Sequence, residues 1–579
     1  MSVILRTFRL LVTVRTGLAG VLALVVLPTA WAQANGLARL EQRGPATQLI
    51  VDGQPYLIRG GELANTASSD AEYMAEVWPR LAAIDLNTVL TGMSWAWVEP
   101  EEGRYDFSIA DRCIAEARQN KLHIVFLWFA SWKNGITSFA PDWVKADQQR
   151  FPRARIASGK SLEVLSTLSE ANRDADARAF AALMRHLQQT DREGTVLMIQ
   201  LENEVGLIGD SRDRTPAANA AFAGPVPREL GDYLQAHRET LFPTLRQVWE
   251  TAGGRTAGTW TEVFGNSEKA NEIFMAWNYA RYMNQVAAAG KAEHPIPIFT
   301  NTWIVQPEDE HPGDYPSGGP EPMTVDIWKA GAPKIDFNAP DIYLPNFKDW
   351  TAWFHRPNNP LFVPESRGDQ LGAAQAFYTV GRHSGLGYSP MGIDDTGRLR
   401  GFRGTVTSSN SVPLADLPMP RAYGVLKQLT PAILEAQAKG TITAVILDSA
   451  NPKEGVVLGN YIVQFNLLRN RRNPADVPAF GYGLAIALGP DEYLVSGENL
   501  EVSFAPNTPG PAIVGLGTLQ AGRFENGRWV TTRLLSGDDI LLRYDLDKAA
   551  EINQSGSGLK FGTFGARRDI QRVRLYRYE

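Results

Sequence analysis

Two stretches of the sequence place carboxylates directly after apolar runs. The run VLMIQLENEVG, residues 196–206, carries Glu202 and Glu204, and the run NNPLFVPESRGD, residues 358–369, leads to Glu365. Two neighbouring carboxyl groups can cleave a glycosidic bond: the protonated one protonates the leaving oxygen, and the ionised one attacks the anomeric carbon. The alternative is that these glutamates form ion pairs at strand ends, because buried carboxylates require partners.

The elements that must position these carboxylates form a regular alternation. Eight short apolar runs predict strands, and helical patterns lie between most of them; the strand runs are YLIRGG, NTVLTGM, HIVFLWF, VLMIQLE, PIFTNTW, NAPDIY, PLFVPE and GLGYSPMGI. This alternation predicts a parallel α/β architecture, and eight is the number of strands that closes a (β/α)8 TIM barrel. An open doubly wound sheet is the alternative, weakened by the lack of a G-x-G-x-x-G motif after the first strand.

A barrel would bring both sets of carboxylates to one rim, because functional groups gather at the C-terminal ends of its strands. Side chains alternate along a strand, so we expect Gln200, Glu202 and Glu204 to share a face, with Glu204 nearest the mouth. Glu365 ends the seventh predicted strand in the same way.

The pattern of apolar and polar residues changes near Gly440. The runs that follow are short and alternating, and Gly, Asn, Asp and Pro separate them, which is typical of an all-β domain of the sandwich type. We therefore expect a catalytic barrel over residues 36–440 and a C-terminal β domain over residues 441–579.

The sequence around Glu202 and Glu204 resembles that of a known family. QLENEVG is similar to the Gln-x-Glu-Asn-Glu-Tyr-Gly motif of glycoside hydrolase family 35, which consists mainly of β-galactosidases. QLIVDGQPYLIRGGE is similar to the opening hairpin and first strand of that family, and LNTVLTGMSWAWVEPEEGRYDF resembles its second strand and the element that follows. The resemblance spans residues 48–365 and implies a retaining barrel glycosidase, here a divergent bacterial branch with its own C-terminal domain.

The resemblance implies roles for individual residues. Glu204 would be the acid/base and Glu365 the nucleophile, while Asn203 would hold the sugar 2-hydroxyl. Tyr343 matches a tyrosine that hydrogen-bonds the nucleophile, with a rim aromatic as the alternative. Trp303 ends a predicted strand and is expected to stack on sugar, with packing as the alternative.

Several positions depart from the familiar members of the family. Gly92 stands where they have Tyr, Ala96 where they have Asn, and residues 130–132 read Ala-Ser-Trp instead of Ala-Glu-Trp. These departures leave the identity of the sugar open. Trp132 and Glu99 are expected to contact substrate, with structural roles as the alternative for both.

Other classes of site lack support in the sequence. The seven histidines show no ligand spacing such as H-E-x-x-H, and the single cysteine, Cys113, has no partner for a thiolate site or disulfide, so we expect no metal and no cofactor. The net charge is −6 and no Lys/Arg run is present, which argues against a nucleic-acid partner. The sequence does not decide the oligomeric state.

The N-terminus predicts export. Three arginines precede an apolar stretch from Gly17 to Leu27, and the small-x-small sequence Ala30-Trp31-Ala32 follows. This layout is typical of a secretory signal over residues 1–32, and the alternative is a membrane anchor. After cleavage we expect no membrane insertion and a periplasmic or secreted protein of a Gram-negative bacterium.

The sequence therefore predicts a retaining exo-β-glycosidase. A β-galactosidase that releases terminal galactose from plant cell-wall oligosaccharides or polysaccharide side chains is the leading activity. An exo-glycosidase for another β-linked sugar and a non-catalytic carbohydrate-binding protein are the alternatives.

Overall fold

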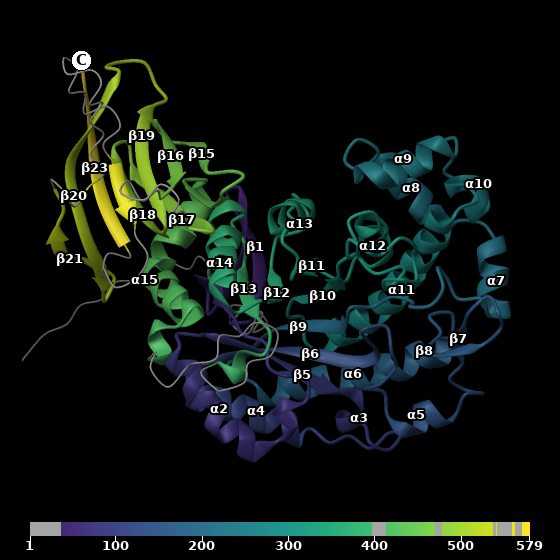
Figure 1. Ribbon diagram of the computed structural model, residues 1–579. Helices are drawn as coiled ribbons and strands as arrows, with labels where there is room; N and C mark the ends of the chain where they lie inside the picture. Colours follow the sequence, from purple (N-terminus) through teal and green to yellow (C-terminus); the bar gives the residue numbers. More distant parts are fainter. Residues whose placement is uncertain (1–35, 397–412, 469–477, 537–539, 541–557, 562–569) are drawn as a thin grey trace, which may run out of the picture.

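The computed structural model describes residues 36–396, 413–468, 478–536, 540, 558–561 and 570–579. Figure 1 shows a barrel with its surrounding helices beside a smaller β domain, with helices α14 (Gln370–Arg382) and α15 (Pro418–Lys439) between them. The predicted signal over residues 1–32 lies outside the described residues. Across the ranges given above, the model contains no helix with both the length and the apolar character that a membrane span requires.

Eight parallel strands form the barrel, as predicted. They are β4 (Ile58–Arg59), β5 (Thr88–Ser94), β6 (His123–Lys133), β9 (Val196–Asn203), β10 (Ile298–Trp303), β11 (Phe337–Asp341), β12 (Val363–Ser366) and β13 (Gly387–Pro390). They neighbour one another in chain order, and β13 pairs with β4. Two isolated parallel bridges complete the ring, Ile342 with Ser366 and Glu62 with Leu90. The sheet is therefore closed, and the open doubly wound alternative is wrong.

The strands are apolar without interruption because both of their faces are buried. In β6, Val125 and Leu127 belong to the core cluster inside the barrel, whereas Ile124, Phe126 and Trp128 belong to the cluster between strands and helices. Burying each such side chain contributes about 1.5–3 kcal/mol. This pattern is the one that parallel sheets covered by helices require.

Helices follow the strands and cover the barrel. The main ones are α2 (Ala71–Ala83), α4 (Ser108–Gln119), α6 (Glu170–Thr190), α11 (Glu268–Glu293), α12 (Val325–Gly331), α13 (Phe347–Phe354), α14 and α15. Shorter elements extend the loops above the barrel: α3 (Trp95–Val98), α5 (Asp142–Ala146), β7 (Arg153–Arg155), β8 (Ser161–Leu165), α7 (Pro216–Ala223), α8 (Arg228–Ala236), α9 (Pro243–Thr251) and α10 (Trp260–Phe264).

An antiparallel sheet closes the N-terminal end of the barrel. It consists of β1 (Arg39–Arg43), β2 (Ala46–Val51) and β3 (Gln54–Tyr56). Leu49 and Val51 join the same apolar cluster as Val125 and Leu197. The open end of the barrel is therefore the end where the C-termini of the strands lie.

The C-terminal part is a β-sandwich, as predicted. One sheet has the order β14-β17-β18-β23-β20-β21 and the other β15-β16-β19-β22. The strands are β14 (Ile442–Asp448), β15 (Lys453–Leu458), β16 (Tyr461–Leu467), β17 (Phe480–Gly489), β18 (Glu492–Glu498), β19 (Leu500–Pro506), β20 (Ile513–Glu525), β21 (Arg528–Leu534), β22 (Gly558–Phe561) and β23 (Ile570–Tyr578). Three of these strands, β15, β20 and β22, are exposed, rich in glycine or short, so an alternating apolar pattern marks them poorly.

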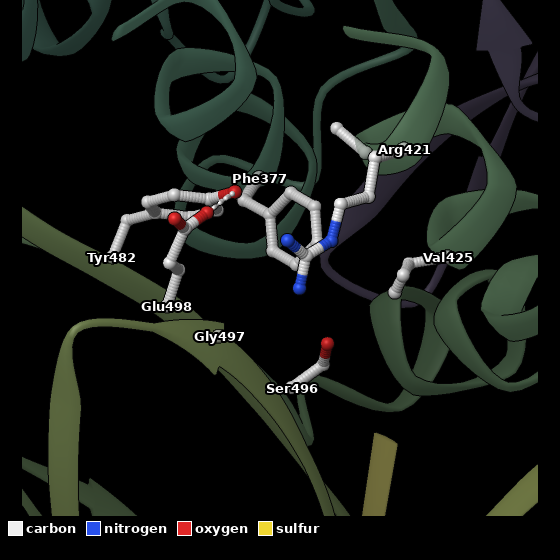
Figure 2. Close-up of a pocket in the computed structure, with 8 residues that line it drawn as sticks. Phe377, Arg421, Val425, Tyr482, Ser496, Gly497 and Glu498 are labelled. Carbon is white, nitrogen blue, oxygen red and sulfur yellow. Dashed lines mark hydrogen bonds between the residues drawn. The ribbon is translucent and has the colours of Figure 1, made fainter. Parts of the chain in front are cut away.

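The sandwich packs on the barrel through one face of its larger sheet. Tyr482, Leu484 and Ile486 of β17 belong to the main core cluster together with residues of α14 and α15. A small pocket at this junction is lined by Phe377 and Val425 from the helices, and Figure 2 shows the Phe377 ring and the Val425 side chain beside the strand that carries Gly497. Within it the Tyr482 hydroxyl donates a 3.1 Å hydrogen bond to Glu498. The sandwich thus braces the helices that follow strands β12 and β13.

Candidate active site

Three carboxylates meet at the C-terminal end of the barrel. Glu204 follows β9, Asp341 ends β11 and Glu365 lies in β12. One oxygen of each lies within 4.8 Å of the others, and all three residues are buried. The two carboxylates predicted as catalytic are therefore brought together, and Asp341 is a third group that the sequence analysis did not select.

The end of strand β9 is turned so that Glu204 reaches this cluster. Glu202 and Glu204 both adopt left-handed backbone conformations, with φ of 60° and 48°. The Glu204 amide donates a 2.9 Å hydrogen bond to Asn301 Oδ1, and Asn134 Nδ2 donates one of 2.5 Å to the Glu204 carboxylate. Such conformations are uncommon for residues other than glycine and persist where surrounding contacts fix them.

The expected alternation therefore fails at Glu202. Its carboxylate accepts hydrogen bonds of 2.9–3.1 Å from the backbone amides of Ala130, Ser131 and Trp132 instead of facing the mouth beside Glu204. Burial raises its pKa well above the usual range, and the neighbouring Asp176 carboxyl raises it further. Glu202 thus fixes the end of strand β6. Because three backbone amides occupy its carboxylate, we assign it a structural role.

Asn301, within β10, orients the groups around Glu204. Its Nδ2 donates to Asn203 Oδ1 at 3.0 Å and to Asp341 Oδ2 at 2.6 Å, while its Oδ1 holds the Glu204 amide. Asn203 also accepts a 3.1 Å hydrogen bond from Gln200. The side chain of Asn203 is therefore oriented from two sides, with its amide nitrogen toward Asn134 at 3.4 Å.

Tyr343 lies beside the second predicted catalytic residue. Its hydroxyl donates a 2.8 Å hydrogen bond to Glu365 Oε1, the contact that the family resemblance implied. Burial raises the pKa of Tyr343, and the Glu365 charge raises it further. The tyrosine therefore stays protonated and serves as a donor to the carboxylate.

Acidic groups that share one buried mouth resist simultaneous ionisation. Burial raises the pKa of Asp341 well above its usual range, and Glu365 and then Glu204 add to the effect. Burial also raises the pKa of Glu62, at the end of the first barrel strand, where Glu365 is its strongest charged neighbour. The mouth therefore favours a bound proton, which an acid catalyst requires.

Two of the residues predicted to contact substrate are buried and have partners within the protein. Trp132 is fully buried, packs against Tyr279 and Tyr282 of α11, and donates its indole hydrogen to the carbonyl of Leu165. Glu99 is buried and accepts hydrogen bonds from Trp95 and the amide of Gly103, both at 2.8 Å. These contacts give both side chains structural partners, in line with the alternative stated for them, and their contact with substrate stays a prediction.

Trp303 keeps the position predicted for it. It ends β10, is partly exposed, and lies opposite Asp341 in the strand register. A ring at this height of the barrel can stack on a sugar bound over the carboxylates.

The structure explains two of the departures from the familiar family members. A side chain at Gly92 would begin 2.4 Å from the carbonyl oxygen of Asn65 and 2.9 Å from the Phe129 ring, so this position has no room for a larger residue. Ser131 donates to Asp176 at 2.7 Å. Neither position supplies a group to the mouth, which leaves recognition of the sugar to other residues.

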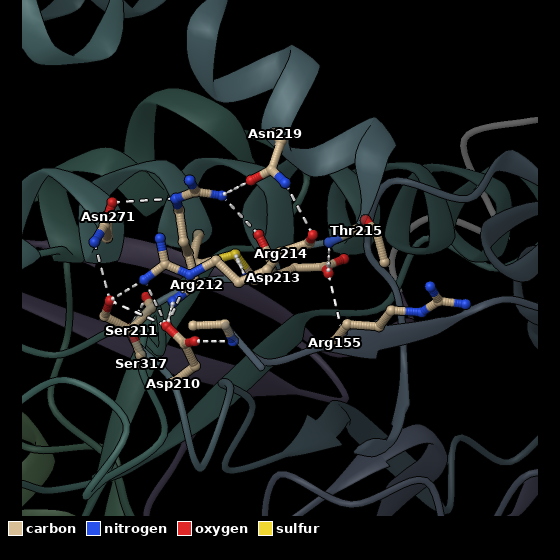
Figure 3. Close-up of polar contacts among 12 residues, drawn as sticks. Arg155, Asp210, Ser211, Arg212, Asp213, Arg214, Thr215, Asn219, Asn271 and Ser317 are labelled. Carbon is tan, nitrogen blue, oxygen red and sulfur yellow. Dashed lines mark hydrogen bonds and ion pairs between the residues drawn. The ribbon is translucent and has the colours of Figure 1, made fainter. Parts of the chain in front are cut away.

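A polar network holds the loop that follows Glu204. Arg214 forms an ion pair of 2.7 Å with Asp210, and Arg212 donates to Asn219 at 2.8 Å and to Asn271 of α11 at 3.2 Å. Figure 3 shows these side chains converging from the loop, α7 and α11. The network ties the exit of strand β9 to the surrounding elements and so restrains Glu204.

Several residues of the site were not predicted from the sequence. Asn301 lies within β10 and Asp341 ends β11, and both strands had been predicted. Glu62, Lys133 and Asn134 also follow or end barrel strands. The three clustered carboxylates have a spacing at which a hard cation could also bind. The expectation of no metal therefore stays a prediction.

The family comparisons match the two parts of the chain separately. Residues 65–303 match the model of glycoside hydrolase family 42, described as Beta-galactosidase, and residues 419–545 match a domain of unknown function. The finer assignment to family 35 is not confirmed; the matching model is a different β-galactosidase family.

Individual proteins are similar to this chain over part of their length. A β-galactosidase of Xanthomonas manihotis is 30% identical over 205 residues, which is 34% of this chain and 31% of that protein, so the match spans about a third of the relative. Solved β-galactosidases of Bacillus circulans sp. alkalophilus and Rahnella sp. R3 are 14% and 15% identical, and both have a TM-score of 0.44. Those matches cover 66% and 65% of this chain and 57% of each structure.

Proposed function

We propose that this chain is a retaining exo-β-glycosidase, with β-galactosides as its leading substrates. The observation that carries the proposal is the approach of Glu204 and Glu365, whose carboxylate oxygens lie within 4.8 Å. Retaining glycosidases hold their two carboxyl groups about 5–5.5 Å apart, whereas inverting ones leave about 6.5–9.5 Å for a water molecule. The match to a β-galactosidase family model supports the substrate class.

In the first step, Glu365 attacks the anomeric carbon and the glycosidic bond breaks, while Glu204 donates its proton to the leaving oxygen. The hydroxyl of Tyr343 orients the attacking carboxylate through its 2.8 Å hydrogen bond. Asn203 is placed to hold the sugar 2-hydroxyl, a contact that can strengthen in the transition state.

In the second step, Glu204 acts as a base and removes a proton from water, which attacks the glycosyl-enzyme and releases Glu365. The sugar leaves with its original configuration. Asn134, 2.5 Å from the Glu204 carboxylate, supports both protonation states because its amide donates to either form.

The configuration of the first product tests this mechanism. Proton NMR during hydrolysis of an aryl β-galactoside should show the β-sugar first, followed by slow mutarotation. The α-sugar as the first product would reject double displacement.

The identity of the sugar is a narrower proposal. Terminal galactose of plant cell-wall oligosaccharides or polysaccharide side chains is the leading natural target, and another β-linked sugar is the second candidate because Gly92 and Ser131 supply no groups to the mouth. Specificity constants for aryl β-galactoside, α-arabinoside and β-glucoside separate these candidates. A strong preference for the glucoside would overturn the galactosidase assignment and leave the mechanism standing. Hydrolysis of none of them, with sugar still bound, would favour a carbohydrate-binding protein.

We further propose that the protein is exported, on the strength of the signal pattern over residues 1–32. N-terminal sequencing of the periplasmic fraction should find a chain that begins near Gln33. A chain that retains Met1 in the inner membrane would show an anchor instead.

A further inference from the structure

Glu62 is a buried carboxylate in the mouth that the mechanism above does not use. It follows β4, is only 1% exposed, and its backbone bridges to Leu90 and Met391 on the two neighbouring strands. Because its backbone is held on both sides, the position of its carboxylate is fixed by the barrel.

The surroundings of Glu62 place its side chain among the catalytic groups. Its strongest charged neighbours are Glu365, Lys133 and Glu204, in that order. Lys133 is itself buried, with its ammonium 5.0 Å from the centre of the Phe129 ring inside the barrel. Glu62 is not one of the three carboxylates clustered within 4.8 Å, so its oxygens lie farther than this from at least one of them.

One oxygen of Glu62 needs a donor. Across the described residues, Oε1 is shielded from solvent and accepts no hydrogen bond. A buried acceptor without a partner costs about 1–3 kcal/mol, and more for a charged group. This oxygen therefore has unused acceptor capacity, which a donor arriving with the substrate would satisfy.

The order of strands around the barrel indicates which part of a sugar would supply this donor. Glu62 follows β4, Glu204 follows β9 and Glu365 lies in β12, so the three surround the mouth from well-separated strands. A pyranose with its anomeric carbon at Glu365 and its leaving oxygen at Glu204 turns its remote hydroxyls to the third side.

We propose that Glu62 is a specificity-determining residue that accepts hydrogen bonds from two neighbouring ring hydroxyls, at C3 and C4, of the sugar being released. This inference rests on the proposed glycosidase function and names the group that recognises the sugar. A carboxylate can accept two hydrogen bonds side by side, which suits a pair of vicinal hydroxyls. The ammonium of Lys133 offsets part of the cost of the buried charge.

A double-mutant-type cycle tests the contact, with the Glu62 charge removed from the enzyme and single hydroxyl groups removed from the substrate. Wild type and Glu62→Gln are compared on the preferred aryl glycoside and on its 3-deoxy, 4-deoxy and 6-deoxy forms. We expect Glu62→Gln to lower kcat/KM on the parent about 10- to 100-fold, since a hydrogen bond to a charged group is lost. The same substitution should cost clearly less on the 3-deoxy and on the 4-deoxy substrate than on the parent, because one of the two contacts is already absent in each.

The 6-deoxy substrate is the internal control, and on it the loss should equal that on the parent. Equal losses on all four substrates would show a structural role and overturn the proposal. If Glu62→Gln does not fold, Glu62→Asp keeps the charge and retracts it by one methylene, and the same coupling is expected at smaller size.

A binding experiment separates this inference from the proposed function. Calorimetry of methyl β-galactoside and its 3-deoxy and 4-deoxy forms repeats the cycle without turnover. A chain that binds sugar with the expected coupling but does not hydrolyse it would refute the glycosidase and retain the Glu62 contact. Hydrolysis by wild type, with no coupling between Glu62 and the C3 or C4 hydroxyl, would retain the glycosidase and refute the Glu62 contact.

Discussion

Glu204 and Glu365 come from the fourth and seventh strands of one barrel, and their carboxylate oxygens lie within 4.8 Å of each other. Hydrogen bonds from neighbouring residues hold both side chains in place. Glu204 is fixed through its backbone amide on Asn301 and its carboxylate on Asn134, and Glu365 accepts a hydrogen bond from Tyr343. This relationship is the basis for assigning acid/base and nucleophile roles to the pair.

Removal of the acid/base should affect substrates according to their leaving groups. Glu204→Ala is expected to lower kcat about 10²–10⁴-fold on substrates with poor leaving groups. An activated aryl group departs without a proton, so the intermediate should accumulate, with a lower apparent KM. Azide should then give a β-glycosyl azide, identified by proton NMR. In the matched variant Glu202→Gln, azide should produce no adduct; rescue there instead would move the assignment by two residues.

Much of the barrel and of this pair could be predicted from the sequence, because buried parallel strands are apolar without interruption and end on polar residues. The orientation of Glu202 could not, since it depends on left-handed backbone at Glu202 and Glu204 that no local pattern signals. Nor could Trp132 be assigned to the core, because its partners Tyr279 and Tyr282 lie far along the chain on α11.

The polar groups missed by the sequence analysis share one physical reason. Asn301 and Asp341 belong to the site because they contact each other, through a 2.6 Å hydrogen bond between adjacent strands. Neither residue alone indicates that contact in the sequence. Glu62 stands beside catalytic groups only because β13 returns to pair with β4 and closes the ring. Contacts of this kind follow from the closure of the barrel, which the sequence indicates only as a strand count.

The Tyr343 hydroxyl is expected to matter for turnover more than for stability. Tyr343→Phe removes the 2.8 Å hydrogen bond to Glu365 and should lower kcat about 10- to 100-fold, with little change in the melting temperature. The matched control is Tyr423→Phe. The Tyr423 hydroxyl is buried and donates to the backbone carbonyls of Gly60 and Tyr388, so it makes no contact with Glu365. A larger loss of kcat in the control than in Tyr343→Phe would contradict the assigned role.

Trp132 and Trp303 should separate stability from binding. Trp132→Ala leaves a cavity against α11 and is expected to destabilise the fold by about 3–5 kcal/mol, which thermal unfolding would detect. Trp303→Ala should leave the melting temperature nearly unchanged and raise KM, because its ring is partly exposed at the mouth. The opposite pattern, with stability lost at Trp303 and KM raised at Trp132, would reverse the two roles.

Glu272 should make stability depend on pH. Burial raises its pKa from 4.5 to about 7, while the Tyr315 hydroxyl, 2.9 Å away, opposes the shift. The folded state therefore binds this proton more tightly than the unfolded state, so its contribution is complete below about pH 4.5 and is lost as pH rises through about 7. That loss amounts to roughly 3 kcal/mol.

Thermal unfolding between pH 5 and pH 8 checks this expectation. Glu272→Gln keeps an oxygen for Tyr315 but cannot ionise, so its melting temperature should fall less than that of wild type over this range. Parallel profiles for the two proteins would show that Glu272 does not titrate as proposed.

The identity of the residue that forms the covalent intermediate tests the central claim most directly. Incubation with 2-deoxy-2-fluoro-β-galactosyl fluoride slows release of the intermediate, and peptide mass spectrometry of the inactivated protein locates the attached sugar. We predict one fluorosugar per chain, bonded to Glu365. A label on Glu204, Asp341 or Glu62, or turnover with inversion and no label, would contradict the assignment of Glu365 as nucleophile and Glu204 as its acid/base partner.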